Sequence, residues 1–316
     1  EFEKDILDEI TDADADIEIE KLSPLLYSFV TSTPAILRKF RVEDDVEEEE
    51  DDEEKEDDKE DGTKQDEKIV KESNDTWVKT YMNDTKYRLI DNLPNGDCFF
   101  LALVKALKTK DIHTSVKDLR SRLSEEITQE HFENYKGRYN DFNKEAHRLY
   151  TQGTAIKESR KTYEASVKKN KKDAAKVKQL LSEYKKQQAK FLNIKKEIKV
   201  IKQLLDKVDF MKNVNNLQEM REKIKEREYY ADEMSISIME RVLNVKLIIL
   251  SGDYYEEGNE SNVIMCLDPD KILKNAGKFL PDNYIILENK GNHYRGIFIE
   301  DQGAFTYDEL DDNLKE

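Results

Sequence analysis

The residue best placed for chemistry is Cys98, which follows the turn sequence Asn95-Gly96-Asp97 and opens a run of apolar residues with helical spacing. A cysteine in the first turn of a helix lies beside unpaired backbone N–H groups and a partial positive charge, and both stabilise a thiolate. The backbone N–H groups of Gly96, Asp97 and Cys98 are candidates for an oxyanion hole, and Asp97 is a candidate helix cap. Gly96 permits unusual backbone angles and close approach. The pattern indicates a nucleophile, with a small buried cysteine as the alternative.

A thiol nucleophile needs a nearby imidazole to take its proton, and His293 is the candidate base. It follows the turn at 289–292 and opens the strand pattern at 293–299, so its side chain is both anchored and accessible. An ordinary histidine at the end of a strand is the alternative. The other histidines fall on polar helical stretches and are expected at the surface: His113, His131 and His147.

The composition restricts the class of protein. Acidic residues outnumber basic ones by 70 to 53, a net charge of −17, which argues against nucleic acid as the main partner. Two cysteines are too few for a disulfide framework or a four-cysteine zinc site, so we expect a reducing compartment. No apolar run reaches the length of a membrane-spanning helix. The second cysteine, Cys266, falls within a predicted strand and is expected in the core.

Changes in composition divide the chain into five segments. Residues 1–42 are expected to be partly ordered, and the acidic residues 43–68 are expected to form a disordered linker, because like charges at this density cannot bury a core. Residues 69–152, with Cys98, and 229–316, with His293, are the two parts of an α/β (α+β) domain. Residues 153–228 are a lysine-rich helical insertion whose apolar residues alternate three and four apart, as in a coiled coil.

Local patterns predict the elements around the two candidate residues. A helix is expected from Cys98 to Leu107, and a second one over 234–243. Four apolar runs predict strands at 245–250, 263–266, 284–287 and 293–299. The last two are close enough in sequence to form an antiparallel hairpin, which would place His293 directly after its turn.

These residues resemble the motifs of the ovarian-tumour (OTU) family of cysteine proteases. The run from Asn95 to Leu103 is similar to the family's Asp-Gly-Asp-Cys-Leu-Phe nucleophile motif, and Asn292-His293-Tyr294 resembles its His-Tyr motif on a late strand. The tail at 303–310 is similar to endings of OTU-like proteins of large DNA viruses. The resemblance covers roughly residues 80–150 and 226–316, and does not include the N-terminal region or the lysine-rich helices.

Two positions depart from the family pattern, and both concern the residue that orients the histidine. The family often has Asp three residues before the cysteine, where this chain has Asn95, and Asp or Asn two residues after the histidine, where it has Arg295. An arginine cannot accept a hydrogen bond from an imidazole N–H. The candidates for the third member of the triad are Asn95, favoured by its motif position, Asn292 and Asp91.

The resemblance implies a papain-like OTU fold with a long helical insertion, and hydrolysis of the peptide or isopeptide bond after the ubiquitin C-terminal glycines. Cys98 would be the nucleophile and His293 the general base, and no metal or organic cofactor is implied. The expected partner is ubiquitin or polyubiquitin and not a membrane, in an intracellular compartment such as a host cytoplasm or a virion; the oligomeric state stays open. The alternative hypotheses are a catalytically silent scaffold within a larger viral protein, and a protease that cleaves a viral polyprotein.

Overall fold

The computed structural model describes residues 71–170, 172–265 and 279–315, and these divide into two compact units. In the described residues, one unit is a helical hairpin over Glu133–Asn213, and the other joins residues 71–132 and 214–315 in a mixed helix and sheet body. The prediction of an α/β (α+β) chain with a long helical insertion is confirmed at this level. The predicted segments 1–42 and 43–68 lie outside the described residues.

The limits of the insertion differ from those predicted. Residue 153 lies inside helix α8 (Gln129–Lys169), and residues 214–228 belong to the helix and sheet body, in which helix α10 (Leu217–Lys225) buries Met220 and Ile224. The prediction rested on the three-and-four spacing of apolar residues together with the frequent lysines, and neither pattern marks where a helix passes from one unit to the other. Three buried residues already continue the hairpin seam ahead of residue 153: Phe142, Ala146 and Leu149.

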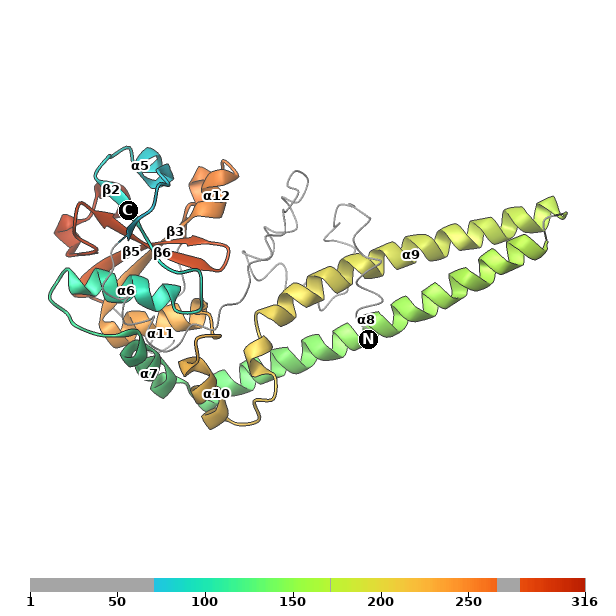
Figure 1. Ribbon diagram of the computed structural model, residues 1–316, viewed down its shortest axis with the longest axis horizontal. Helices are drawn as coiled ribbons and strands as arrows, with labels where there is room; N and C mark the ends of the chain where they lie inside the picture. Colours follow the sequence, from blue (N-terminus) through green and yellow to red (C-terminus); the bar gives the residue numbers. More distant parts are fainter. Residues whose placement is uncertain (1–70, 171, 266–278, 316) are drawn as a thin grey trace. The chain divides into compact units, whose positions relative to one another are not determined.

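The α/β unit is built on a mixed sheet that has seven strands in the part of the chain the structure describes, in the order β1-β2-β6-β5-β3-β4, with β7 paired to β5 (Figure 1). Strands β3 and β5 are parallel, and the other pairs are antiparallel. The predicted hairpin of β5 and β6 is confirmed, and its turn contains Gly291 with a φ of 60°, which favours glycine. The strands are β1 Lys71–Glu72, β2 Tyr87–Asp91, β3 Val245–Ser251, β4 Ile264–Met265, β5 Asn283–Lys290, β6 His293–Ile299 and β7 Ala304–Phe305. Cys266 lies outside the described residues.

Helices cover both faces of this sheet, so its central strands are continuous apolar runs (Figure 1). The face that carries Ile286 and Ile297 forms a core with Trp77 of helix α5 and with the aromatic residues of helix α12. Side chains alternate along a strand, so Tyr294 of β6 points to the other face, where its ring meets Phe99 of helix α6. The helices of this unit are α5 Trp77–Tyr81, α6 Cys98–Lys108, α7 Val116–Glu126, α10, α11 Glu233–Leu243 and α12 Gly252–Glu256, with 3-10 turns η3 Glu260–Asn262, η4 Tyr307–Glu309 and η5 Asp312–Leu314.

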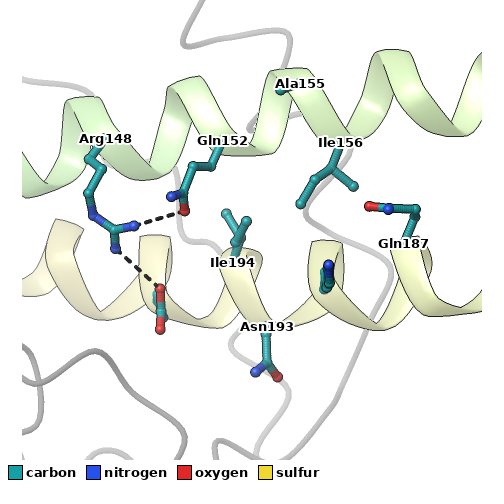
Figure 2. A pocket seen from close by; sticks show the side chains of 9 residues that line it. Arg148, Gln152, Ala155, Ile156, Gln187, Asn193 and Ile194 are labelled. Atoms are coloured by element: carbon teal, nitrogen blue, oxygen red, sulfur yellow. Dashed lines mark hydrogen bonds and ion pairs between the residues drawn. The ribbon is translucent and has the colours of Figure 1, made fainter.

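The helical unit is an antiparallel pair, α8 and α9 (Ala174–Asp206), followed by the 3-10 turn η2 (Asp209–Met211) (Figure 1). Its seam has the predicted spacing, and the buried residues of α9 are Phe191, Ile194, Ile198, Val200, Ile201 and Leu204. A shallow groove between the two helices is polar at one end, where Arg148 donates to Gln152 at 2.8 Å and lies 3.8 Å from Glu197 (Figure 2). None of the described helices is long and apolar enough to span a bilayer.

A buried charge network joins β5, β6 and the segment that precedes α5. Glu288 on β5 is fully buried, and both of its carboxylate oxygens accept hydrogen bonds from the guanidinium of Arg295 on β6. Arg295 also donates to Ser73 at 2.9 Å and to Asp75 at 3.0 Å, and the indole of Trp77 donates to Glu288 at 2.8 Å. Position 295 is therefore occupied by a residue that fixes β6 to its neighbours.

We expect Arg295→Ala to lower the free energy of unfolding by about 3–5 kcal/mol, because it leaves the Glu288 carboxylate buried without a counter-charge. Denaturant unfolding followed by circular dichroism measures this loss. Arg88→Ala is the matched control: its partner Asp301 is 98% exposed, and such a surface pair contributes less than about 1 kcal/mol. Equal losses in the two variants would contradict the assignment of Arg295 to the buried network.

Candidate active site

Cys98 is the first residue of α6, as predicted, and its side chain is buried. Its sulfur accepts a hydrogen bond from the backbone N–H of Tyr294 at 3.4 Å and donates to the carbonyl oxygen of Asn292 at 3.8 Å. These two residues flank His293, so the thiol lies against the first residues of β6. The helix that carries Cys98 and the strand that carries His293 are thus in direct contact.

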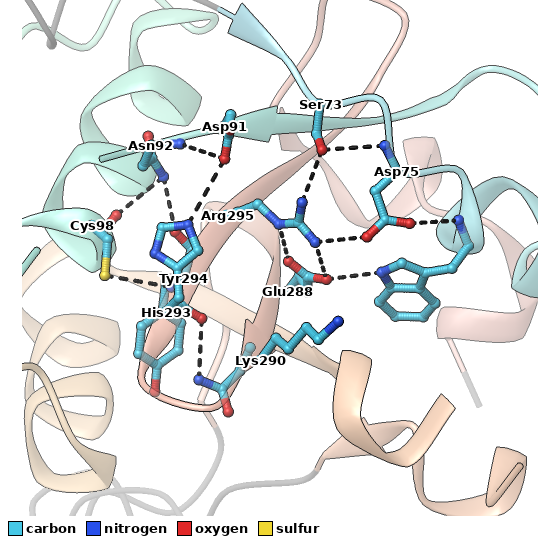
Figure 3. A network of polar contacts seen from close by, with 12 residues as sticks. Ser73, Asp75, Asp91, Asn92, Cys98, Glu288, Lys290, His293, Tyr294 and Arg295 are labelled. Atoms are coloured by element: carbon cyan, nitrogen blue, oxygen red, sulfur yellow. Dashed lines mark hydrogen bonds and ion pairs between the residues drawn. The ribbon is translucent and has the colours of Figure 1, made fainter. Parts of the chain in front are cut away.

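The two nitrogens of the His293 ring have different surroundings (Figure 3). Its Nε2 atom lies 3.8 Å from Oδ1 of Asp91, the last residue of β2. Its Nδ1 atom is buried and has no hydrogen-bond partner among the described residues. An imidazole held in this way has one nitrogen oriented by a carboxylate and the other available to accept a proton.

Burial acts on both members of the Cys98 and His293 pair and favours their neutral forms. It raises the pKa of the Cys98 thiol, which the hydrogen bonds from the backbone of Tyr294 and Phe99 only partly offset. It also lowers the pKa of His293, as does the positive charge of Arg295, while Asp91 acts in the opposite direction. The expected effect of the helix N-terminus is present, because the N–H of Phe99 lowers the pKa of the thiol, but the desolvation of the sulfur is the larger effect.

Asp91, and not Asn95, is the residue placed to orient the histidine. β2 pairs antiparallel with β6, with Ile90 opposite Gly296, so the end of β2 meets the beginning of β6. The side chain of Asn95, which motif position favoured, instead accepts the backbone N–H of Asp97 at 3.0 Å. Asn292 takes part through its backbone carbonyl, which accepts from Cys98.

The predicted oxyanion donors are partly engaged within their own turn. The N–H of Asp97 donates to the Asn95 side chain, and the N–H of Cys98 donates to the Asn95 carbonyl at 3.1 Å. Of the three predicted donors, only the N–H of Gly96 has no acceptor among the described residues. An incoming oxyanion therefore finds one donor ready and two that must exchange partners.

Two buried polar residues that sequence reasoning missed, Asn92 and Lys105, connect β2, β6 and α6 around the candidate site. Asn92 donates to the carbonyl oxygens of Cys98 at 3.2 Å and Tyr294 at 3.0 Å, and its own side-chain oxygen accepts from Lys105 at 2.9 Å. Lys105 also donates to the carbonyl of Asp91 at 3.0 Å. The sequence contained one signal for Lys105: it lies seven residues after Cys98 and therefore on the same face of α6, which predicts a position close to the site.

Arg120 on α7 forms hydrogen bonds to the turn Asn95-Gly96-Asp97 that precedes Cys98, which we call the nucleophile turn. Its guanidinium, 3% exposed, donates to Asp97 at 2.9 Å, to the carbonyl of Gly96 at 2.8 Å, and to the carbonyls of Ile224 at 2.8 Å and Tyr229 at 3.1 Å. Asp97 was predicted to cap α6 with its side chain, but it does not. Its carboxylate instead binds Arg120 and, at 3.0 Å, Arg227. The turn is thereby tied to the backbone that follows α10.

The other histidines are at least partly exposed, as expected from their polar surroundings in the sequence: His113 and His147 are exposed and His131 is half-buried. Among residues 71–170, 172–265 and 279–315, no group of three or more His, Cys, Asp or Glu side chains is arranged to hold a metal ion.

No family model matches the chain, and the curated proteins give no match either. Among solved structures, the chain is similar to one described as "Structure of Ovarian Tumor (OTU) domain in complex with Ubiquitin". The identity is 15%, the TM-score is 0.33, and the alignment covers 72% of this chain and 78% of that one.

Gly96 is required for close approach and not for a left-handed backbone conformation. A Cβ atom at this position would lie 1.7 Å from the carbonyl oxygen of Arg227. We expect Gly96→Ala to displace the nucleophile turn and to slow alkylation of Cys98 or change its pH dependence, measured by mass spectrometry of the intact chain. Gly137→Ala is the matched control, because a Cβ there meets nothing within 4 Å and alanine favours the helix. If both variants react like the parent chain, the close contact at Gly96 is not important for the site.

Proposed function

We propose that this chain is an OTU-like cysteine protease that hydrolyses ubiquitin peptide or isopeptide bonds, with Cys98 as nucleophile, His293 as general base and Asp91 as the residue that orients the base. One observation carries the proposal: the buried Nδ1 of His293 has no partner among the described residues while Nε2 faces a carboxylate, and the thiol rests against the backbone on both sides of this histidine. A thiol nucleophile requires a neighbouring imidazole nitrogen that can accept its proton, and Nδ1 of His293 is the nitrogen that this proposal assigns to that role.

The reaction begins from the neutral pair. Nδ1 of His293 takes the thiol proton as the sulfur of Cys98 adds to the carbonyl carbon of the scissile amide, and the resulting imidazolium is stabilised by Asp91. The tetrahedral oxyanion then collapses, the C–N bond breaks, and the imidazolium gives its proton to the leaving amine. A water molecule, deprotonated by His293, attacks the thioester, releases the carboxylic acid and restores the thiol.

The nucleophile turn supplies the oxyanion site in this proposal. The N–H of Gly96 is available, and the N–H groups of Asp97 and Cys98 can join it when they release the side chain and carbonyl of Asn95. Asn95 is thus assigned to the conformation of the turn and not to the triad. Arg120 keeps the carbonyl of Gly96 on the opposite side, which orients the peptide plane.

The choice of substrate rests on the motifs and not on the geometry. The sequences Asn95-Gly96-Asp97-Cys98 and Asn292-His293-Tyr294 resemble the OTU family, whose substrates are ubiquitin conjugates. An origin in a large DNA virus and an intracellular location are proposed on the same resemblance.

A second candidate is a scaffold that binds the same partner without hydrolysing it. The raised pKa of the buried Cys98 thiol and the engaged N–H groups of the turn favour it, because both are properties of an unreactive site. Arg295 no longer favours it, since that residue belongs to the buried network with Glu288 and not to the triad position.

A ubiquitin vinyl-sulfone probe separates these two functions. We expect the probe to form a covalent adduct at Cys98, and Cys98→Ala to abolish both the adduct and hydrolysis of ubiquitin chains. Because base and nucleophile act as a unit, His293→Ala should lower turnover by about three orders of magnitude or more. Cys266→Ser is the control and should retain the adduct, because the proposal assigns the reaction to Cys98 alone. Tight ubiquitin binding without an adduct would favour the scaffold, and absence of both would sink the assignment of ubiquitin.

The role of Asp91 has its own signature. Asp91→Asn should lower kcat about 10- to 1,000-fold, because the imidazolium loses the carboxylate that stabilises it. Asp91 raises the pKa of His293, so its removal should move the acidic limb of the kcat/KM profile to lower pH. Asn95→Ala is the comparison variant and should leave that limb in place, because its side chain does not contact the imidazole. A shift in Asn95→Ala and none in Asp91→Asn would return the role to Asn95.

A further inference from the structure

Positive charge is concentrated in the helical hairpin. Residues 133–213 contain 22 lysines and arginines against 10 acidic residues, so their net charge is 22 − 10 = +12. The whole chain carries −17, and the residues outside this range therefore carry −17 − 12 = −29. The chain thus combines a strongly basic hairpin with a strongly acidic remainder.

Seven lysines at the outer half of the hairpin have no carboxylate partner among the described residues. All seven are exposed, and we refer to them as the outer lysines: Lys168, Lys169, Lys172, Lys176, Lys178, Lys185 and Lys190. Two other lysines of the same region are paired with acids one turn away, Lys161 with Glu158 and Lys186 with Glu183. Glu158 and Glu183 are thus engaged by other lysines, and the outer lysines are a surplus of positive charge.

The hairpin does not need the outer lysines for its own stability. The buried seam of α9 is formed by apolar residues that include Phe191, Ile194 and Ile198, whereas the outer lysines are exposed. Lys176 and Lys178 lie near the N-terminus of α9, where the helix dipole disfavours cations, and the first turn of this helix contains no acid. Lys186 and Lys190 are four residues apart, a spacing at which like charges repel. An anionic partner would relieve both costs.

The chain itself contains a partner of the opposite charge. Residues 43–61 include 16 acidic residues and two lysines, a net charge of 2 − 16 = −14, which is close in size to that of the hairpin. A stretch of 19 residues can extend over about 60 Å. The outer lysines of α9, from Lys176 to Lys190, are spread over about 20 Å of helix. The acidic stretch is therefore long enough to contact all of them at once.

We propose that the outer lysines are the docking surface for the acidic segment 43–61 of the same chain, and that this contact keeps other polyanions away from the hairpin. Because both parts belong to one chain, the effective concentration of the acidic segment is high and many weak pairs suffice. Exposed ion pairs are screened by salt, so the contact is strong at low ionic strength and weak at high ionic strength.

Binding of a fluorescent single-stranded poly(U) RNA to the full chain tests the masking. A variant in which every Asp and Glu of 43–61 is replaced by Asn or Gln keeps the length of the segment but removes its charge. We expect it to bind the RNA about tenfold more tightly than the parent at low salt, with the difference lost at high salt. Unchanged RNA affinity would overturn the proposal.

The lysine variants locate the surface. With all seven outer lysines changed to Gln, neutralising the acidic segment should no longer raise RNA affinity. The matched control changes Lys195→Gln and Lys196→Gln, two half-buried residues of the same helix, and should keep the full effect. If the effect persists without the outer lysines, the acidic segment acts through another surface or through net charge alone, and the assignment is wrong.

A carbodiimide cross-linker, which joins carboxylates to amines only when they touch, shows the contact directly. We expect cross-links from 43–61 to the outer lysines, at a yield independent of protein concentration. An equal mixture of chains with natural and heavy nitrogen should give cross-links within one isotope only. Cross-links spread evenly over the lysines of the α/β unit, or mostly between chains of different isotope, would overturn an intramolecular docking at the hairpin.

Discussion

The site depends on one buried ion pair, that of Asp97 and Arg120. Asp97 immediately precedes Cys98, and the guanidinium of Arg120 donates to its carboxylate and to the backbone carbonyls of Gly96, Ile224 and Tyr229. A charge this deeply buried is costly unless it is paired and hydrogen-bonded, and Arg120 makes four such hydrogen bonds. This pair restricts the position of the turn before Cys98, because displacing the turn would leave a buried carboxylate and a buried guanidinium without their partners.

A second buried ion pair, that of Glu288 and Arg295, fixes the position of the strand that carries His293. Arg295, two residues after His293, joins β6 to Glu288 of β5 and to the segment that precedes α5. Asn92 and Lys105 form hydrogen bonds that connect β2, β6 and α6. Apolar packing alone would leave the register of these elements to shape complementarity. Buried polar groups add a directional requirement, which places two side chains from opposite ends of the chain beside each other.

The parts of this arrangement that were predictable are those with local signals. Cys98 at a helix start and His293 after a hairpin turn are both visible in a few residues of sequence. Asp91 depends on the pairing of β2 with β6, which are about 200 residues apart, and nothing near Asp91 announces it. Asn95 had the better motif position, but its side chain accepts a hydrogen bond from the backbone N–H of Asp97 within the same turn. The raised pKa of the thiol also had no local signal, because the helix terminus is local whereas the burial that raises the pKa is a property of the whole fold.

The long helical insertion is compatible with this rigid site because its two ends are held together within the α/β unit. Arg221 of α10 donates to the carbonyl of Ile127 at 2.7 Å, and Ser124 of α7 donates back to the carbonyl of Arg221 at 2.9 Å. The chain therefore leaves and returns at one place, and the entropy of closing such a loop grows only slowly with its length. The hairpin has its own apolar seam, so its length and surface charge can vary while Arg120 continues to hold the nucleophile turn. Site geometry and the surface chemistry of the hairpin are in this way separate properties of the same chain.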